Sequence, residues 1–313
     1  MVKILSQIEL PELEQAVKSA HDDVDISYLG IGENVPAGTS ADCLLAVASN
    51  LQGLDAVIAD IEGLKWVQVV GSGIDGFPLN ALGDRVLTTC KGVSAVPIAE
   101  WVMAMILTQA KSLPGQWISA PPETWSFGNA PIASLNTQKL ALVGFGTIGR
   151  AIAQRALAFG MQVSAMTRTS TPDLDGVNHA SSFSELVKNA DHIVLAAPST
   201  KATHHLLNRE TFAALKPGAH LINIARGELV NEADLKTALD DGIISCASLD
   251  VAQNEPLTDG HWFYTDARIR FSPHISWGDP EIVERMTRVF LENLALFKND
   301  LPLKNVFDVE AGY

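Results

Sequence analysis

A glycine-rich turn between a short apolar strand and a helix limits most strictly what this chain can fold into. The strand predicted at Leu140–Val143 runs into Gly144-Phe145-Gly146-Thr147-Ile148-Gly149, and a helix is predicted over Ile148–Phe159. The first glycine permits a tight turn, the second lets the backbone approach a pyrophosphate, and the third lets helix and strand pack closely. The free amides at the helix start would face the phosphates. The motif predicts a dinucleotide-binding βαβ unit; the competing interpretation is a turn that binds nothing.

Short apolar runs alternate with helical patterns on both sides of this turn. Before it, the predicted strands are Val2–Leu5, Ile26–Leu29, Cys43–Ala48, Trp66–Val70 and Val86–Thr89. From the turn onward they are Leu140–Val143, Gln162–Met166, His192–Ala196, His220–Ile224 and Cys246–Leu249, with Arg270–Ser272 as an edge strand. The predicted helices are Pro11–Ala20, Val96–Lys111, Ile148–Phe159, Ser182–Asn189, Thr211–Leu215, Glu232–Asp240 and Pro280–Lys298. This alternation predicts an α/β fold with parallel sheets, and 313 residues suffice for two domains.

The formal net charge of −14 argues against some classes of partner. Binding to nucleic acid needs a clustered basic face, and the sequence has no run of Lys and Arg that could form one. The longest uninterrupted apolar run, Trp101–Leu107, is far shorter than the ~20 residues that a membrane span requires. We therefore expect neither a nucleic-acid nor a membrane partner, and any anionic ligand must be held by local positive charge.

Cysteine and histidine usage indicates the compartment and the absence of metal. The three cysteines form no C-x-x-C pair, which suits a reducing environment; they are Cys43, Cys90 and Cys246. The N-terminal residues Met1–Leu5 have a strand pattern and not that of a signal peptide. The pair His204-His205 lacks the spacing of a metal-ligand pair. These features predict a cytoplasmic protein without a metal site.

The end of the strand after the glycine turn indicates which dinucleotide is bound. NAD sites carry an acid there, which accepts hydrogen bonds from the ribose hydroxyls. In this chain Thr167 stands at that position and Arg168 and Thr169 follow. A guanidinium with neighbouring hydroxyls would bind a 2′-phosphate that a carboxylate would repel. We expect NADP(H) to be preferred, with NAD(H) as the alternative; the competing interpretation makes Arg168 an ordinary solvated residue.

Three ionisable residues follow strands of the second series: Arg226, Glu255 and His274. Chemistry in open α/β sheets gathers at the carboxyl ends of strands. An arginine can bind a carboxylate in a bidentate manner, a histidine can donate a proton to a carbonyl oxygen, and an acid can orient that histidine. Taken singly, they could be a surface ion pair, a Glu-Pro turn and a structural histidine. Together, behind a dinucleotide motif, they predict hydride chemistry on a keto acid.

These segments resemble the D-isomer-specific 2-hydroxyacid dehydrogenase family, which includes glyoxylate/hydroxypyruvate reductases, D-lactate dehydrogenases and phosphoglycerate dehydrogenases. The resemblance covers most of the chain. It rests on Leu64-Lys65 through Gly73-Ile74-Asp75, Ala99-Glu100, the glycine turn, Leu215-Lys216-Pro217-Gly218-Ala219, Ala225-Arg226-Gly227, Leu249-Asp250-Val251, Glu255-Pro256 and Pro273-His274.

The resemblance implies roles for residues of both domains. Arg226 would bind the substrate carboxylate and carbonyl, His274 would be the acid/base and Glu255 its partner. Ser72 and Gly73, in the loop Gly71-Ser72-Gly73, would bind the substrate carboxylate. The implied cofactor contacts are Gly144, Gly146, Thr147, Ile148, Gly149, Thr167, Arg168, Thr169, Pro198, Thr203, Ala225 and Asp250, the last at the nicotinamide carboxamide.

The resemblance also implies an architecture. Two Rossmann-like or flavodoxin-like domains would flank a cleft, residues 1–97 plus 281–313 binding substrate and residues 98–280 binding NAD(P), in a homodimer. The expected activity is NADP(H)-dependent reduction of a small 2-keto acid, of the glyoxylate or hydroxypyruvate type, to the D-2-hydroxy acid.

Several alternatives and departures accompany this expectation. The protein could instead reduce larger aryl or branched keto acids, or act as a non-catalytic dinucleotide sensor or co-repressor. Formate or phosphite chemistry ranks lower, because a formate enzyme of this family carries Gln where Glu255 stands. Trp277 stands where smaller residues are common, and Trp125 lies near a segment that reaches the partner's pocket in some members; either could simply pack in an interface or a core.

Overall fold

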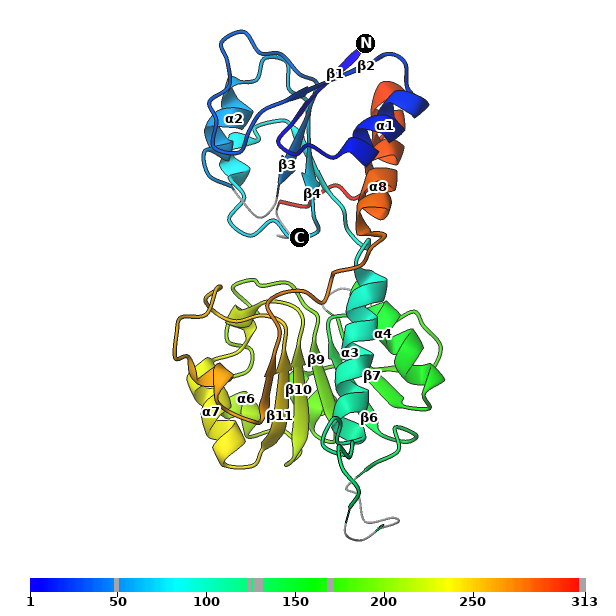
Figure 1. The fold of residues 1–313 in the computed structure, drawn as a ribbon, viewed down its shortest axis with the longest axis vertical. Coiled ribbons are helices and arrows are strands. Elements are labelled where there is room, and N and C mark those ends of the chain that lie inside the picture. Colours follow the sequence, from blue (N-terminus) through cyan, green and yellow to red (C-terminus); the bar gives the residue numbers. More distant parts are fainter. Residues whose placement is uncertain (48–50, 123–124, 126–131, 168–171, 310–313) are drawn as a thin grey trace. The chain divides into compact units, whose positions relative to one another are not determined.

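The chain divides into two compact units. The structure is a computed structural model that describes residues 1–47, 51–122, 125, 132–167 and 172–309. The first unit comprises Met1–Val93 and Asp279–Tyr313, and the second comprises Ser94–Gly278 (Figure 1). The sequence predicts the boundaries between the two domains after residue 97 and after residue 280, a few residues later in the chain than the boundaries in the structure.

The first unit contains a five-stranded parallel sheet in the order β2-β1-β3-β4-β5. Its strands are β1 (Val2–Ser6), β2 (Val24–Tyr28), β3 (Cys43–Val47), β4 (Trp66–Val70) and β5 (Val86–Thr89). Its helices are α1 (Pro11–Ala20), α2 (Leu54–Asp60), the 3-10 helix η1 (Leu79–Ala81) and α8 (Ile282–Lys298). This strand order is that of flavodoxin-like doubly wound sheets.

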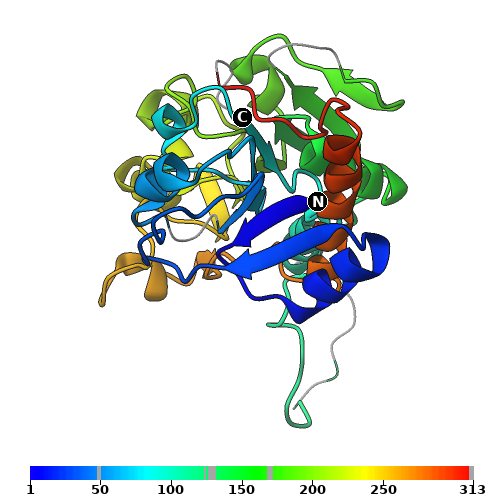
Figure 2. The same ribbon diagram turned by 90° about the horizontal axis from the view of Figure 1, so that it is seen from above.

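Helices cover both faces of this sheet because successive strand residues point to opposite sides. Ile4 and Trp66 pack with α1 and α8, whereas Leu5 and Val67 pack with α2. The Trp66 ring stacks on Phe290 of α8 with centroids 5.4 Å apart. Figures 1 and 2 both show α8, from the end of the chain, beside α1. The C-terminal helix is therefore part of the first unit's core.

The second unit contains a seven-stranded parallel sheet in the order β12-β11-β10-β9-β6-β7-β8. Its strands are β6 (Lys139–Val143), β7 (Gln162–Met166), β8 (Val177–His179), β9 (His192–Leu195), β10 (Ala219–Asn223), β11 (Ile244–Leu249) and β12 (Ile269–Phe271). Its helices are α3 (Ala95–Ala110), α4 (Thr147–Ala158), α5 (Phe183–Val187), α6 (Arg209–Phe212) and α7 (Glu232–Asp240), with 3-10 helices η2 (Gly227–Leu229) and η3 (Trp262–Tyr264).

This order is the Rossmann arrangement with one further edge strand, and the chain reverses direction across the sheet between β6 and β9. Leu140 and Leu142 face α3 and α4, which lie side by side in Figure 1. Ala141 and Val143 face the layer formed by α5, α6 and α7. The predicted α/β fold with parallel sheets is thus confirmed, and ligands of such sheets bind where the strand order reverses.

Some predicted elements are wrong in extent. The helix predicted at Thr211–Leu215 runs over Arg209–Phe212, because Asn208 caps it and shares a reciprocal capping box with Thr211. The helix predicted at Ser182–Asn189 extends only over Phe183–Val187, the bounds of α5. Ser182 precedes this helix as its N-cap, because the Ser182 side chain accepts a hydrogen bond from the Glu185 amide. The strand β8 and the helix α2 were not predicted. Ala48, where one predicted strand ends, lies outside the described residues; the other described strand and helix ends differ by no more than two residues.

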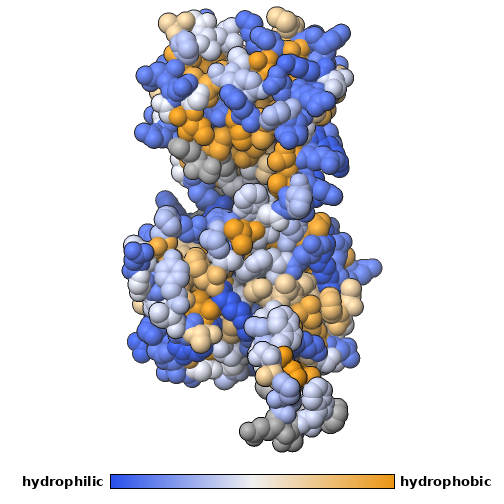
Figure 3. Space-filling view, viewed as in Figure 1, coloured by the Kyte–Doolittle hydropathy of each residue, from blue (hydrophilic) through white to orange (hydrophobic). Residues whose placement is uncertain are grey.

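The surface is mixed in character. On the face drawn in Figure 3, hydrophilic residues are interspersed with hydrophobic patches. Large exposed hydrophobic side chains of the second unit include Trp117, Trp125, Tyr264, Ile275 and Trp277. Within the residues that the structure describes, no helix combines the length and apolar character of a membrane span.

Candidate active site

The glycine turn follows β6, where the strand order of the second sheet reverses. Gly144 has φ +99°, and a Cβ there would lie 2.7 Å from the Ala196 carbonyl oxygen at the end of β9. A Cβ on Gly149 would lie 2.4 Å from the Gly144 carbonyl oxygen. A Cβ on Gly146, in contrast, would meet no protein atom within 4 Å. The first and third glycines are thus required by packing, and the second leaves its backbone open to a ligand, which fits a dinucleotide pyrophosphate.

The loop after β9 closes on itself beside this turn. The Thr203 hydroxyl donates to the Pro198 carbonyl oxygen at 2.7 Å and accepts from the Thr200 amide at 2.8 Å. Thr167 lies at the end of β7 and is partly buried. Arg168 and Thr169 lie outside the described residues.

Arg226 is presented by a turn that Asn223 holds at the end of β10. Asn223 is buried; its side-chain amide donates to the Arg226 carbonyl oxygen at 2.8 Å, and its side-chain oxygen accepts from the Ala225 amide at 3.0 Å. A Cβ on Gly227 would lie 1.9 Å from the carbonyl carbon of Ala252, so only glycine fits there. The backbone after Arg226 therefore packs directly against the loop that follows β11.

Asp250, at the end of β11, fixes the turn that carries His274. It is 1% exposed. Its carboxylate accepts hydrogen bonds from the Ser272 hydroxyl at 2.5 Å and from the Ile275 and Ser276 amides at 2.9 Å each. Its carbonyl oxygen accepts from the His274 amide at 2.8 Å. His274 has φ +55°, a conformation unfavourable for a non-glycine residue, and these bonds hold the turn that imposes it. The nicotinamide contact expected of Asp250 stays a prediction.

Glu255 and His274 form a directly bonded pair. The distance from Glu255 Oε2 to His274 Nδ1 is 2.9 Å, and Glu255 Oε1 accepts a hydrogen bond from the Ala252 amide at 2.9 Å. The two side chains are 42% exposed for His274 and 35% for Glu255. An ionised carboxylate only accepts hydrogen bonds, so Nδ1 carries the hydrogen, and Nε2 is the ring nitrogen left to exchange a proton with a substrate.

Further residues, which sequence reasoning did not identify, hold the loop between Asp250 and Glu255. Glu232, the first residue of α7, accepts from the Gln253 amide at 3.0 Å and lies 3.3 Å from His261 Nε2. The Gln253 side chain lies 2.7 Å from His205 Nε2. With Asn223, these residues position the chemistry-bearing loops. The sequence signal for Asn223, Glu232, Gln253 and His261 was their nearness to Arg226 or Glu255 along the chain, whereas His205 lies far from both in sequence.

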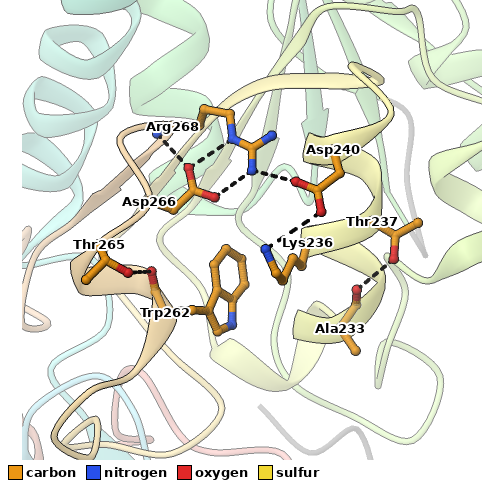
Figure 4. A network of polar contacts seen from close by, with 8 residues as sticks. All are labelled: Ala233, Lys236, Thr237, Asp240, Trp262, Thr265, Asp266 and Arg268. Atoms are coloured by element: carbon orange, nitrogen blue, oxygen red, sulfur yellow. Dashed lines mark hydrogen bonds and ion pairs between the residues drawn. The ribbon is translucent and has the colours of Figure 1, made fainter.

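A surface network fastens the segment that leads into β12 and then to His274 (Figure 4). Arg268 Nη2 lies 2.6 Å from Asp266 Oδ2 and 2.7 Å from Asp240 Oδ1 on α7. The hydrogen bond from Arg268 lowers the pKa of Asp266 to about 2. Lys236 Nζ lies 5.4 Å from the centroid of the Trp262 ring, within the range of a cation–π contact. The contacts tie α7 to the start of β12.

The first unit carries the loop predicted to bind the substrate carboxylate. The loop follows β4, and the Ser72 hydroxyl donates to the Cys90 carbonyl oxygen at 3.0 Å while Gly71 accepts from the Cys90 amide at 2.8 Å. Ser72 and Gly73 therefore lie at the carboxyl end of the first unit's sheet. Their role toward a substrate stays a prediction.

A doubly wound sheet with this glycine turn at its reversal point defines a dinucleotide-binding unit. Arg226 and the Glu255–His274 pair lie at the carboxyl ends of neighbouring strands of this unit. These side chains are of the kinds that can bind an anion and transfer a proton, and their roles in a reaction stay a prediction.

Comparisons with known proteins specify the class further. Residues 103–276 match the family model "D-isomer specific 2-hydroxyacid dehydrogenase, NAD binding domain". The chain is 31% identical to glyoxylate/hydroxypyruvate reductase B of Enterobacter agglomerans over 74% of this chain and 74% of that protein. It is 32% identical to D-3-phosphoglycerate dehydrogenase of Bacillus subtilis over 85% of this chain, but spans only 51% of that protein.

A solved structure agrees with these matches. The D-isomer specific 2-hydroxyacid dehydrogenase from Xanthobacter autotrophicus Py2, solved with NADPH and MES, is 25% identical, with a TM-score of 0.82 over 100% of this chain and 99% of that one. The chain therefore belongs to the D-isomer specific 2-hydroxyacid dehydrogenase family, whose members are NAD(P)-dependent oxidoreductases.

Proposed function

We propose that this protein reduces a small 2-keto acid to the corresponding D-2-hydroxy acid with NADPH as the electron donor. The observation that carries the proposal is the 2.9 Å contact between Glu255 and His274, in the unit that also presents Arg226 and the glycine turn. Glyoxylate and hydroxypyruvate are the first substrates to test, which the name of the Enterobacter relative supports.

Each residue of the site has one task in the proposed reaction. The Arg226 guanidinium binds the substrate carboxylate and the carbonyl oxygen, for which its planar fork of donors is suited. His274 Nε2 donates a proton to the carbonyl oxygen, while Glu255 holds the opposite ring nitrogen and stabilises the charged ring. The residues of the glycine turn would hold the nicotinamide dinucleotide, which would supply a hydride, one hydrogen nucleus with two electrons, for reduction of the carbonyl carbon. The products are the hydroxy acid and the oxidised cofactor.

In this proposal the second unit binds the dinucleotide through Gly144, Gly146 and the start of α4, and it also supplies Arg226 and His274 to the substrate. Ser72 and Gly73 of the first unit are proposed as further contacts of the substrate carboxylate. Thr167 in place of an acid, followed by Arg168 and Thr169, supports a preference for NADP(H). We further propose a cytoplasmic homodimer, in keeping with the resemblance to the family.

The test is a panel of keto acids, each assayed with NADPH and with NADH. We expect oxidation of NADPH with glyoxylate or hydroxypyruvate at a higher kcat/KM than with NADH. Dinucleotide binding without turnover of glyoxylate, hydroxypyruvate or phenylpyruvate would instead support a non-catalytic sensor and contradict the proposal.

A further inference from the structure

The turn after His274 places two large apolar side chains at the surface. Ile275 is 53% exposed and Trp277 is 43% exposed, whereas Ser276 between them is 5% exposed. This alternation is set by Asp250, whose carboxylate accepts hydrogen bonds from the Ile275 and Ser276 amides. The apolar pair is thus a fixed feature of the turn and flanks the histidine of the site.

Trp277 is fastened to His274 itself. Its indole Nε1 donates to the His274 carbonyl oxygen at 2.7 Å. A tryptophan usually buries most of its apolar surface and bonds its N–H. In Trp277 the N–H is bonded, while much of the ring stays at the surface. The hydrogen bond therefore fixes the position of the side chain, although the described residues of its own unit do not cover it.

The position of the reacting oxygen relates this surface to the substrate. Because Glu255 occupies Nδ1 of His274, a substrate carbonyl oxygen must approach Nε2 within about 3 Å to receive its proton. The substituent on the carbonyl carbon then lies a few bond lengths from the imidazole, and Ile275 and Trp277 are large, exposed apolar side chains on the turn that carries this imidazole.

We propose that Trp277, together with Ile275, forms an apolar wall against the substituent on the carbonyl carbon and so determines which keto acids are preferred. The proposal rests on the function proposed above and extends it: an alkyl or aryl substituent is favoured over a hydroxymethyl group of equal size. Covering an apolar wall with an apolar group lowers the free energy of the bound state. A hydroxyl group placed against the same wall loses its hydrogen bonds to water and finds no new partner there.

The test compares two keto acids of nearly equal size, 2-oxobutyrate and hydroxypyruvate, which differ by a methyl in place of a hydroxyl. We expect Trp277→Ala to lower the ratio of their kcat/KM values by about tenfold, the scale at which one apolar group is discriminated. Glyoxylate, which has no carbon substituent, should change much less than 2-oxobutyrate. Trp277→Phe keeps an apolar ring and should retain the ratio.

Tyr264→Ala provides a matched control, since Tyr264 is an exposed aromatic residue of the same unit on η3. It should leave the ratio unchanged. An equal loss for all three substrates in Trp277→Ala would show a purely structural role, and a rise in the ratio would show that the indole excludes apolar groups; either result overturns the proposal. Absence of wild-type turnover with every keto acid would instead refute the proposed function.

Discussion

Glu255 accepts two hydrogen bonds, one on each carboxylate oxygen: from the Ala252 amide at 2.9 Å and from His274 Nδ1 at 2.9 Å. One oxygen thus fixes the side chain to its own loop while the other fixes the imidazole. The acid and the histidine come from different strand ends, so their contact depends on the parallel pairing of β11 with β12.

Replacing Glu255 by Gln should reduce turnover while preserving the fold. Glutamine offers one oxygen and one amino group, so when the oxygen accepts from the Ala252 amide the amino group faces His274 Nδ1. That contact requires the tautomer with the hydrogen on Nε2, and the protonated ring, which carries a hydrogen on both nitrogens, loses its acceptor. We expect kcat to fall about 10- to 100-fold, part of the ~10²–10⁴-fold that proton transfer contributes. Steady-state kinetics with NADPH check this, with an unchanged thermal midpoint as the control. Wild-type kcat in Glu255→Gln would remove Glu255 from the reaction.

The second and third glycines of the turn should respond differently to an added methyl group. Gly146 has φ −80°, and a Cβ meets no protein atom within 4 Å, so Gly146→Ala should fold normally and bind dinucleotide at least about tenfold more weakly. Gly149→Ala brings a Cβ to 2.4 Å from the Gly144 oxygen and should lower the free energy of unfolding. Calorimetric titration with NADPH and thermal unfolding separate the two effects. Unweakened cofactor binding in Gly146→Ala would contradict the assignment of the site.

Arg168 should determine the choice between the two dinucleotides. Arg168→Asp replaces a cation that would pair with the 2′-phosphate by a carboxylate that would repel it and bind ribose hydroxyls. We expect the ratio of kcat/KM for NADPH to that for NADH to fall by at least about tenfold, since such pairs contribute more than ~1.4 kcal/mol. Arg209→Asp, at the exposed start of α6, is the control. An unaltered ratio in Arg168→Asp would count against NADP(H) preference.

A buried pair of histidines should make the second unit sensitive to acid. His192 Nδ1 lies 3.1 Å from His220 Nδ1, while their Nε2 atoms bond Gln138 at 2.8 Å and Ser248 at 2.9 Å. One proton can lie between the facing nitrogens, and a second would break the bond and bury a charge. Burial lowers the pKa of His192 to about 4, against the opposing effect of Asp191. Burial, together with the charges of His192 and Arg270, holds the pKa of His220 well below its usual range.

The sign of the pH dependence follows from these lowered values. Below about pH 6.5 these histidines bind protons in the unfolded chain but not in the folded chain. The free energy of unfolding therefore has its full value above pH 6.5 and falls as the pH falls toward 4. Each group contributes a slope of up to about 1.4 kcal/mol per pH unit. Denaturant unfolding across this range measures it. His192→Gln should reduce the slope of the free energy of unfolding against pH. His179→Gln, at an exposed position of β8, is the control and should leave this slope unchanged. Equal slopes in the wild type and in His192→Gln would contradict the prediction.

The α/β class and most element positions could be predicted, because apolar runs and glycine turns report local structure directly. The three-residue strand β8 could not, since Val177–His179 has a single apolar residue. The start of α6 was misplaced because the capping role of Asn208 depends on a reciprocal side-chain contact with Thr211.

The proximity of Glu255 and His274 was foreseeable from the rule that parallel strands end at one edge. The supports of the site were not, because the bonds of Asn223, Asp250 and Glu232 to backbone amides depend on the conformation of the turns. The His192–His220 contact likewise requires the register of β9 against β10, which places the two residues opposite each other and which local pattern does not specify.

The most direct test of the account is the rate of NADPH oxidation by His274→Ala with the best keto acid of the wild-type panel. If His274 donates the proton, kcat falls by at least about 10²-fold while NADPH binding is retained. Wild-type turnover by His274→Ala would contradict the central claim.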